Sequence, residues 1–108
     1  MNIKRPQTME EYIELVDQAV FETADLRASI EYDSEFMEGV AGFVTELENE
    51  LNILLKSLKD ESYAFSKEDL PFMSLVNSVS DMLLPFKHLL RQINNTHTLG
   101  LETGQEKT

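Results

Sequence analysis

The chain has 108 residues, of which 20 are acidic and nine are basic, for a formal net charge of −11. This length accommodates one domain, and a hydrophobic fraction of 42% is sufficient for a folded core. The absence of cysteine excludes disulfides, thiol catalysis and thiolate metal sites.

The acidic excess lies in the first half of the chain. Residues 8–50 hold thirteen acids and one base, Arg27, whereas residues 51–108 hold seven acids and six bases. Such a surface repels phosphate groups, so we expect neither nucleic acid nor an anionic membrane as a partner. No apolar run is long enough to span a bilayer, and no secretory signal is recognisable at the N-terminus. We therefore expect a cytoplasmic protein whose possible partner is a basic protein.

The first predicted helix begins after Thr8. The sequence TMEE at 8–11 matches a capping box, with Thr8 as N-cap and Glu11 reaching back to it. Apolar residues then recur at steps of three and four, which predicts an amphipathic helix ending near Ile30 or Glu31. These residues are Met9, Tyr12, Val16, Ala19, Leu26 and Ile30.

A second helix is predicted from about residue 35 to 59, because apolar residues there follow a heptad pattern. They are Met37, Val40, Val44, Leu47, Leu51, Leu54 and Leu58. The acidic stretch EYDSEFME at 31–38 precedes them. A calcium loop of twelve residues beginning at Glu31 would end at Gly42. The sequence does not match such a loop, since Phe36 stands where glycine is required and Gly42 stands where a bidentate glutamate is required. We interpret it as a helix start, capped by Asp33 or Ser34.

A third helical segment follows, with Ser66 as its predicted N-cap. Its heptad stripe is formed by Phe72, Val76, Val79, Leu83, Phe86, Leu90 and Ile93. Pro85 interrupts the segment, because its ring clashes with the preceding turn and it has no N–H to donate. The apolar phase is the same on both sides of Pro85, which favours a kink over a break.

These segments predict an all-α fold, an antiparallel three-helix up-down-up bundle whose third helix is kinked or split near Pro85. The helical domain covers residues 8–97, between a flexible N-terminal segment at 1–7 and a disordered tail at 98–108. The apolar stripes are broader than a core three side chains wide requires, so we expect a homodimer.

Few residues indicate catalysis. A di-metal bundle needs Glu-x-x-His pairs, and neither His88 nor His97 has a glutamate three residues earlier. We therefore expect no metal or cofactor. RQINNTH at 91–97 is similar to the Arg-x(4–6)-His motif of HEPN-type helical ribonucleases. That resemblance implies an alternative function, a small nuclease using Arg91 and His97.

The strongest functional candidates are partner-binding residues. Glu14, Asp17, Glu22 and Asp25 place like charges along the first helix without an interleaved lysine. Gly39 and Gly42 weaken the second helix. They indicate either an early break in this helix or a helix or partner backbone that approaches between Phe36 and Phe43 and offsets the cost.

We therefore expect a non-enzymatic interaction module. Its size and charge are typical of dedicated chaperones, anti-activators and antitoxin-like inhibitors. A cation-responsive acidic protein is the other alternative. Tyr63 and Phe65, between the second and third segments, are expected either to cap the bundle or to contact a partner.

Overall fold

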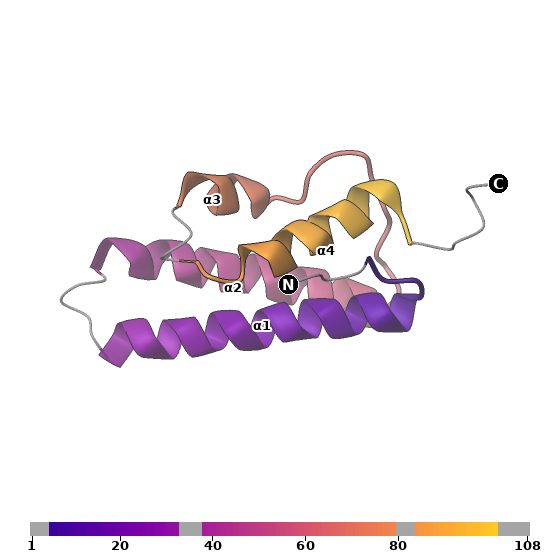
Figure 1. The fold of residues 1–108 in the computed structure, drawn as a ribbon. Helices are drawn as coiled ribbons and strands as arrows, with labels where there is room; N and C mark the ends of the chain where they lie inside the picture. The colour runs from indigo at the N-terminus through magenta and orange to yellow at the C-terminus, as the bar shows by residue number, and fades with distance from the viewer. Residues whose placement is uncertain (1–4, 33–37, 80–83, 102–108) are drawn as a thin grey trace.

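The computed structural model of the protein describes residues 5–32, 38–79 and 84–101. These residues form four helices, α1 (Met9–Tyr32), α2 (Glu38–Lys59), α3 (Met73–Ser78) and α4 (Lys87–Leu99) (Figure 1). The described residues contain no strand, which confirms the all-α class.

The capping box at the start of α1 is confirmed in one of its two halves. The Thr8 hydroxyl accepts a hydrogen bond from the Glu11 N–H at 3.1 Å. The Glu11 carboxylate, however, accepts from the N–H of Gln7 at 2.8 Å instead of that of Thr8. The first bond satisfies one of the N–H groups that the first turn of a helix leaves without partners, and the second fixes the residue before the N-cap.

The two long helices lie side by side and run in opposite directions, as their short link predicts (Figure 1). Arg27 on α1 donates to the Glu48 carboxylate on α2 with an Nε–Oε1 distance of 2.6 Å. The stripe residues between the helices are buried, which places the core along this seam. They are Tyr12, Val16, Ala19, Val44, Leu47, Leu51, Leu54 and Leu58. The predicted caps Asp33 and Ser34 lie outside the described residues.

The predicted third helix is two helices. α3 ends at Ser78, and Val79 is extended, with φ −116° and ψ 158°. α4 begins at Lys87, just after Pro85. The favoured prediction of a kinked but continuous helix is therefore wrong, and the segment is split.

The break has physical causes beyond proline. The Lys87 ammonium donates to the Val79 carbonyl, one of the groups that a helix end leaves without an N–H partner. Leu84, between the two helices, is fully buried, so burial of apolar surface continues across the break. The N-cap prediction at Ser66 is also wrong, since its hydroxyl accepts from the Glu68 N–H within a loop.

α4 runs back along α1, so that its C-terminal end lies beside the N-terminal end of α1 (Figure 1). The up-down-up order is not confirmed, because two helices, α3 and α4, occupy the segment that was predicted to form one helix. Phe72, Val76, Leu90 and Ile93 are buried by this arrangement within the chain itself. Most of the described apolar stripe residues are thus buried within a single chain, without a second copy. The homodimer stays a prediction.

Candidate functional site: the outward face of α1

One side of α1 points away from the rest of the chain. Each residue turns a helix by about 100°, so residues at steps of three and four share a side. We call this side the outward face of α1, and it comprises the exposed residues Glu10, Glu14, Asp17, Phe21 and Asp25. Buried Tyr12 and Ala19 lie on the opposite side of the same helix.

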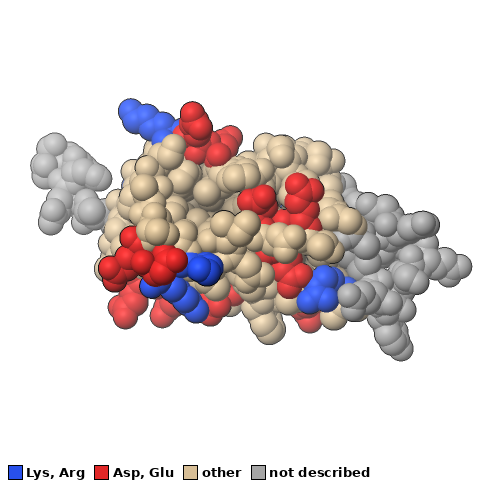
Figure 2. All heavy atoms as spheres, turned by 180° about the vertical axis from the view of Figure 1, so that it is seen from behind, with Lys and Arg blue, Asp and Glu red and all other residues tan. Residues whose placement is uncertain are grey.

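The outward face carries uncompensated negative charge. In the part of the chain that the structure describes, none of its four carboxylates has an ion-pair partner. Arg27, the only base in residues 8–50, is turned towards α2 by its contact with Glu48. Acidic side chains also predominate over basic ones on the side of the molecule seen in Figure 2. The outward face of α1 therefore attracts cationic groups and repels anionic ones.

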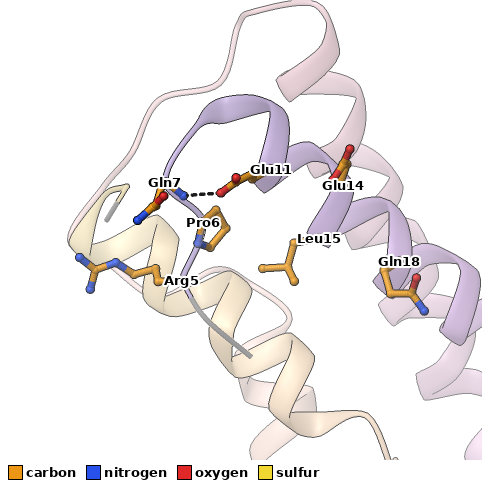
Figure 3. Close-up of a pocket in the computed structure, with 7 residues that line it drawn as sticks. All are labelled: Arg5, Pro6, Gln7, Glu11, Glu14, Leu15 and Gln18. Carbon is orange, nitrogen blue, oxygen red and sulfur yellow. Dashed lines mark hydrogen bonds between the residues drawn. The ribbon is translucent and has the colours of Figure 1, made fainter. Parts of the chain in front are cut away.

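A shallow hollow of about 390 Å³ adjoins the N-terminal end of this face (Figure 3). Its lining comprises Arg5, Pro6, Gln7, Glu11, Glu14, Leu15 and Gln18. Arg5 and Glu14 stand on opposite sides of it in this view. Base and acid are mixed at this end, whereas Asp17 and Asp25 lie further along the sequence of α1.

Phe21 is the residue of this face that the sequence analysis missed. Its side chain is 64% exposed and belongs neither to the core nor to the partly buried residues packed against it. An aromatic residue costs a helix roughly 0.5 kcal/mol relative to alanine, and here no packing offsets that cost. The available signal was its helical phase, since Phe21 lies four residues from both Asp17 and Asp25.

The other predicted partner-binding residues are more scattered. Glu22 is half-buried on the flank of α1, where it accepts a hydrogen bond from Gln18 at 2.8 Å. Gly42 is exposed on α2, and a Cβ there would meet no atom within 4 Å, so nothing in the described chain approaches it closely. Phe43 is half-buried against the core. Phe36 and the side-chain surroundings of Gly39 lie outside what the structure describes.

A second polar cluster joins three elements at the end of the bundle. The Tyr12 hydroxyl donates to the Ile93 carbonyl at 3.2 Å and lies 3.2 Å from the Tyr63 hydroxyl. The Tyr63 hydroxyl in turn lies 2.5 Å from Nδ1 of His97. The Phe65 ring stacks on Tyr12, with ring centroids 6.1 Å apart. Within this chain, Tyr63 and Phe65 therefore cover the end of the bundle.

The protonation states in this cluster favour a structural role. Burial lowers the pKa of His97, although a hydrogen bond with the Glu68 backbone and the charge of Asp69 oppose the shift. With His97 neutral, the Tyr63 hydroxyl donates and Nδ1 accepts. Burial raises the pKa of both Tyr63 and Tyr12, so neither hydroxyl is activated as a base or nucleophile.

A hollow of about 330 Å³ beside His97 offers no free polar group among the hydroxyls that line it. The Ser57 hydroxyl donates to the Leu54 carbonyl at 2.8 Å, and the Ser62 hydroxyl donates to the Asp60 carboxylate at 2.6 Å. Tyr63, which also lines it, is already bonded to His97. All three hydroxyls are thus already hydrogen-bonded within the chain.

The structure does not bring the two residues of the nuclease alternative together. Arg91 is exposed on α4, whereas His97 is 7% exposed and is bonded to Tyr63. Among the described residues, no group of three or more acidic or histidine side chains has the arrangement of a metal site. His88 is exposed.

Comparisons with protein-family models, curated proteins and solved structures found no match. None of the described helices is both long enough and apolar enough to cross a membrane.

Proposed function

We propose that this protein is a non-enzymatic helical interaction module that binds a basic protein through the outward face of α1. The observation that carries the proposal is the row of exposed carboxylates without ion-pair partners at Glu10, Glu14, Asp17 and Asp25. Like charges at such spacing cost the isolated helix a few tenths of a kcal/mol per pair. A basic partner turns this cost into attraction.

The carboxylates act mainly on the rate of encounter. Exposed charges of one sign steer an oppositely charged protein towards the face, and this raises the association rate more than the lifetime of the complex. Salt screens the attraction, with a Debye length of about 8 Å at physiological ionic strength. Binding is therefore expected to weaken as salt is added.

Homodimerisation is a separate part of the proposal, and it uses another surface. Two copies meeting through the outward face of α1 would set Asp17 and Asp25 against like charges. Sedimentation equilibrium over a range of concentrations measures whether the chain is a monomer or a dimer. A monomer at all concentrations would remove the dimer and leave the docking proposal intact.

Two variants with the same net charge test the docking face. The first carries E14Q, D17N and D25N on the outward face, and the second carries E46Q, E61Q and E68Q at exposed positions elsewhere. Each is used as bait in a host-cell lysate at low and high salt, and captured proteins are identified by mass spectrometry. We expect a basic protein to bind the wild type and the second variant at low salt only, and not the first.

Equal capture by both variants would overturn the proposal, because net charge instead of its location would then control binding. Thermal unfolding of both variants serves as the control for folding. All six positions are exposed, so both are expected to retain the helical fold.

A further inference from the structure

Phe21 stands in the middle of the outward face of α1, with an aspartate one helical turn away on either side. Asp17 precedes it by four residues and Asp25 follows it by four, and all three side chains are exposed. Residues four apart on a helix have Cβ atoms about 5–6 Å from each other. The ring and the two carboxylates therefore form one continuous patch.

We infer that the docked partner presents an arginine whose guanidinium stacks on the Phe21 ring and donates to the carboxylate of Asp17 or Asp25. This inference rests on the proposed function and names the side chain that the face recognises. Arginine is planar and weakly hydrated, so one face can lie on an aromatic ring while its N–H edge binds a carboxylate.

Lysine fits this patch less well. Its ammonium is a compact and strongly hydrated charge, so it pairs with a carboxylate without covering the ring. The four carboxylates alone would attract arginine and lysine to a similar extent. An exposed aromatic ring between them adds a preference, because cation–π attraction places a guanidinium over its face. Phe21 is thus the expected anchor of the interface, surrounded by steering charges.

The charges of the face also decide between occupants. A second copy of this chain would bring its own acids against Asp17 and Asp25, which disfavours a symmetric contact centred on Phe21. A nucleic acid or an anionic lipid surface is repelled for the same reason. A basic protein segment satisfies both the ring and the carboxylates.

A pair of synthetic peptides stands in for the natural partner in testing the inference. They are short, helical, acetylated and amidated, and one carries arginine wherever the other carries lysine. Dissociation constants are measured by fluorescence anisotropy at fixed low salt. At an exposed site we expect the wild type to bind the arginine peptide about two- to five-fold more tightly than the lysine peptide.

Three variants test whether the Phe21 ring causes the preference for arginine over lysine. Phe21→Leu keeps an apolar side chain but removes the ring, and we expect it to bind both peptides equally. Phe21→Tyr restores a ring and is expected to restore the preference. Ile53→Ala alters a side chain that is also 64% exposed, but on α2, and is expected to behave as the wild type.

Each remaining outcome overturns a distinct claim. Equal binding of the two peptides by the wild type, or a preference that survives Phe21→Leu, overturns the arginine inference while docking by charge still stands. Failure of both peptides to bind, or undiminished binding by the E14Q/D17N/D25N variant, overturns the proposed function itself. Concentration-dependent dimerisation that Phe21→Leu abolishes would overturn the inference by showing that a second copy covers the ring.

Discussion

The Tyr63 hydroxyl lies 2.5 Å from Nδ1 of His97, and this contact ties the loop after α2 to the last turns of α4. A second bond reinforces it, from the Ser66 N–H to the His97 carbonyl at 3.3 Å. Tyr12 on α1 lies beneath both and donates to α4 through the Ile93 carbonyl. Three elements are thus held together at one end of the bundle by a few polar contacts, whose contributions are measurable one by one.

The first prediction concerns pH. Burial keeps the folded-state pKa of His97 below its ordinary value, whereas in the unfolded chain the group titrates near pH 6.5. Below about pH 6.5 the unfolded chain therefore binds more protons than the folded protein, and stability falls as pH falls. Denaturant midpoints measured between about pH 7.5 and pH 5.5 should decrease towards the acidic end.

Two histidine variants test whether His97 causes this dependence of stability on pH. His97→Gln should flatten the decline between about pH 7.5 and pH 5.5, because it removes the group whose pKa differs between the two states. His88→Gln removes an exposed histidine from the same helix and should leave the decline as in the wild type. A slope unchanged in His97→Gln would mean that other groups cause it.

The two tyrosines should contribute unequally to stability. Tyr63→Phe leaves Nδ1 of buried His97 without a donor, which costs about 1–3 kcal/mol of unfolding free energy. Tyr12→Phe loses the hydrogen bond to the Ile93 carbonyl and should cost only about 0.5–1.5 kcal/mol. Urea denaturation of both variants and of the double variant measures these costs. A Tyr12→Phe cost equal to or larger than that of Tyr63→Phe would contradict this ranking.

Asn94 is the second polar anchor of the loop. Its Oδ1 accepts from the Leu70 N–H at 2.7 Å, and its Nδ2 donates to the Asp69 carboxylate at 3.0 Å. Asn94→Ala leaves the backbone N–H of buried Leu70 without its acceptor and should cost about 1–3 kcal/mol of unfolding free energy. Asn95→Ala, at an exposed site of the same helix, should stay within about 0.5 kcal/mol of the wild type. A loss in Asn94→Ala no larger than that in Asn95→Ala would contradict the anchoring role of Asn94, because alanine favours a helix more than asparagine does.

The glycines predict changes of opposite sign. Gly42 is exposed within α2 with open space at its Cβ position, so Gly42→Ala should raise the unfolding free energy by about 0.5–1 kcal/mol. Gly100 follows α4 with φ 87°, a conformation that alanine adopts only with strain. Gly100→Ala should therefore lower stability. Thermal melts check both signs, and a destabilising Gly42→Ala would mean that another chain closely approaches α2 in solution.

Much of the helical hairpin was predictable from periodicity. The stripes of α1 and α2 recur at steps of three and four, and the sequence analysis named most of their buried residues. Thr23 and Leu55 are also buried but were not named, and Met9 was named but is 36% exposed. The capping box also located the start of α1. Local sequence carries this information because a helix must bury one stripe and satisfy its first N–H groups.

The third segment was predictable only in part. The unchanged apolar phase across Pro85 favours one helix, but two short helices in different directions can bury the same residues. The choice depends on tertiary contacts, such as the one between the Lys87 ammonium and the Val79 carbonyl. Helical propensity describes local preferences and gives no information on such tertiary contacts, so the break after Ser78 could not be predicted from the sequence.

The candidate site shows the same division. The acids of α1 are evident from composition, and three of the four named acids lie on its outward face. Phe21 was overlooked because an aromatic residue in an amphipathic helix suggests core. His97 stood out in the sequence as chemistry, yet burial and Tyr63 give it a structural role.

The most direct measurement is photo-cross-linking in the native host from position 21. The photoreactive amino acid benzoylphenylalanine replaces Phe21 or, as a control, Ile53, since both side chains are 64% exposed. The account predicts an adduct with one basic protein from position 21 only, lost when Glu14, Asp17 and Asp25 are neutralised. An adduct from position 53 alone, or one from position 21 that survives neutralisation, would contradict docking through the outward face of α1.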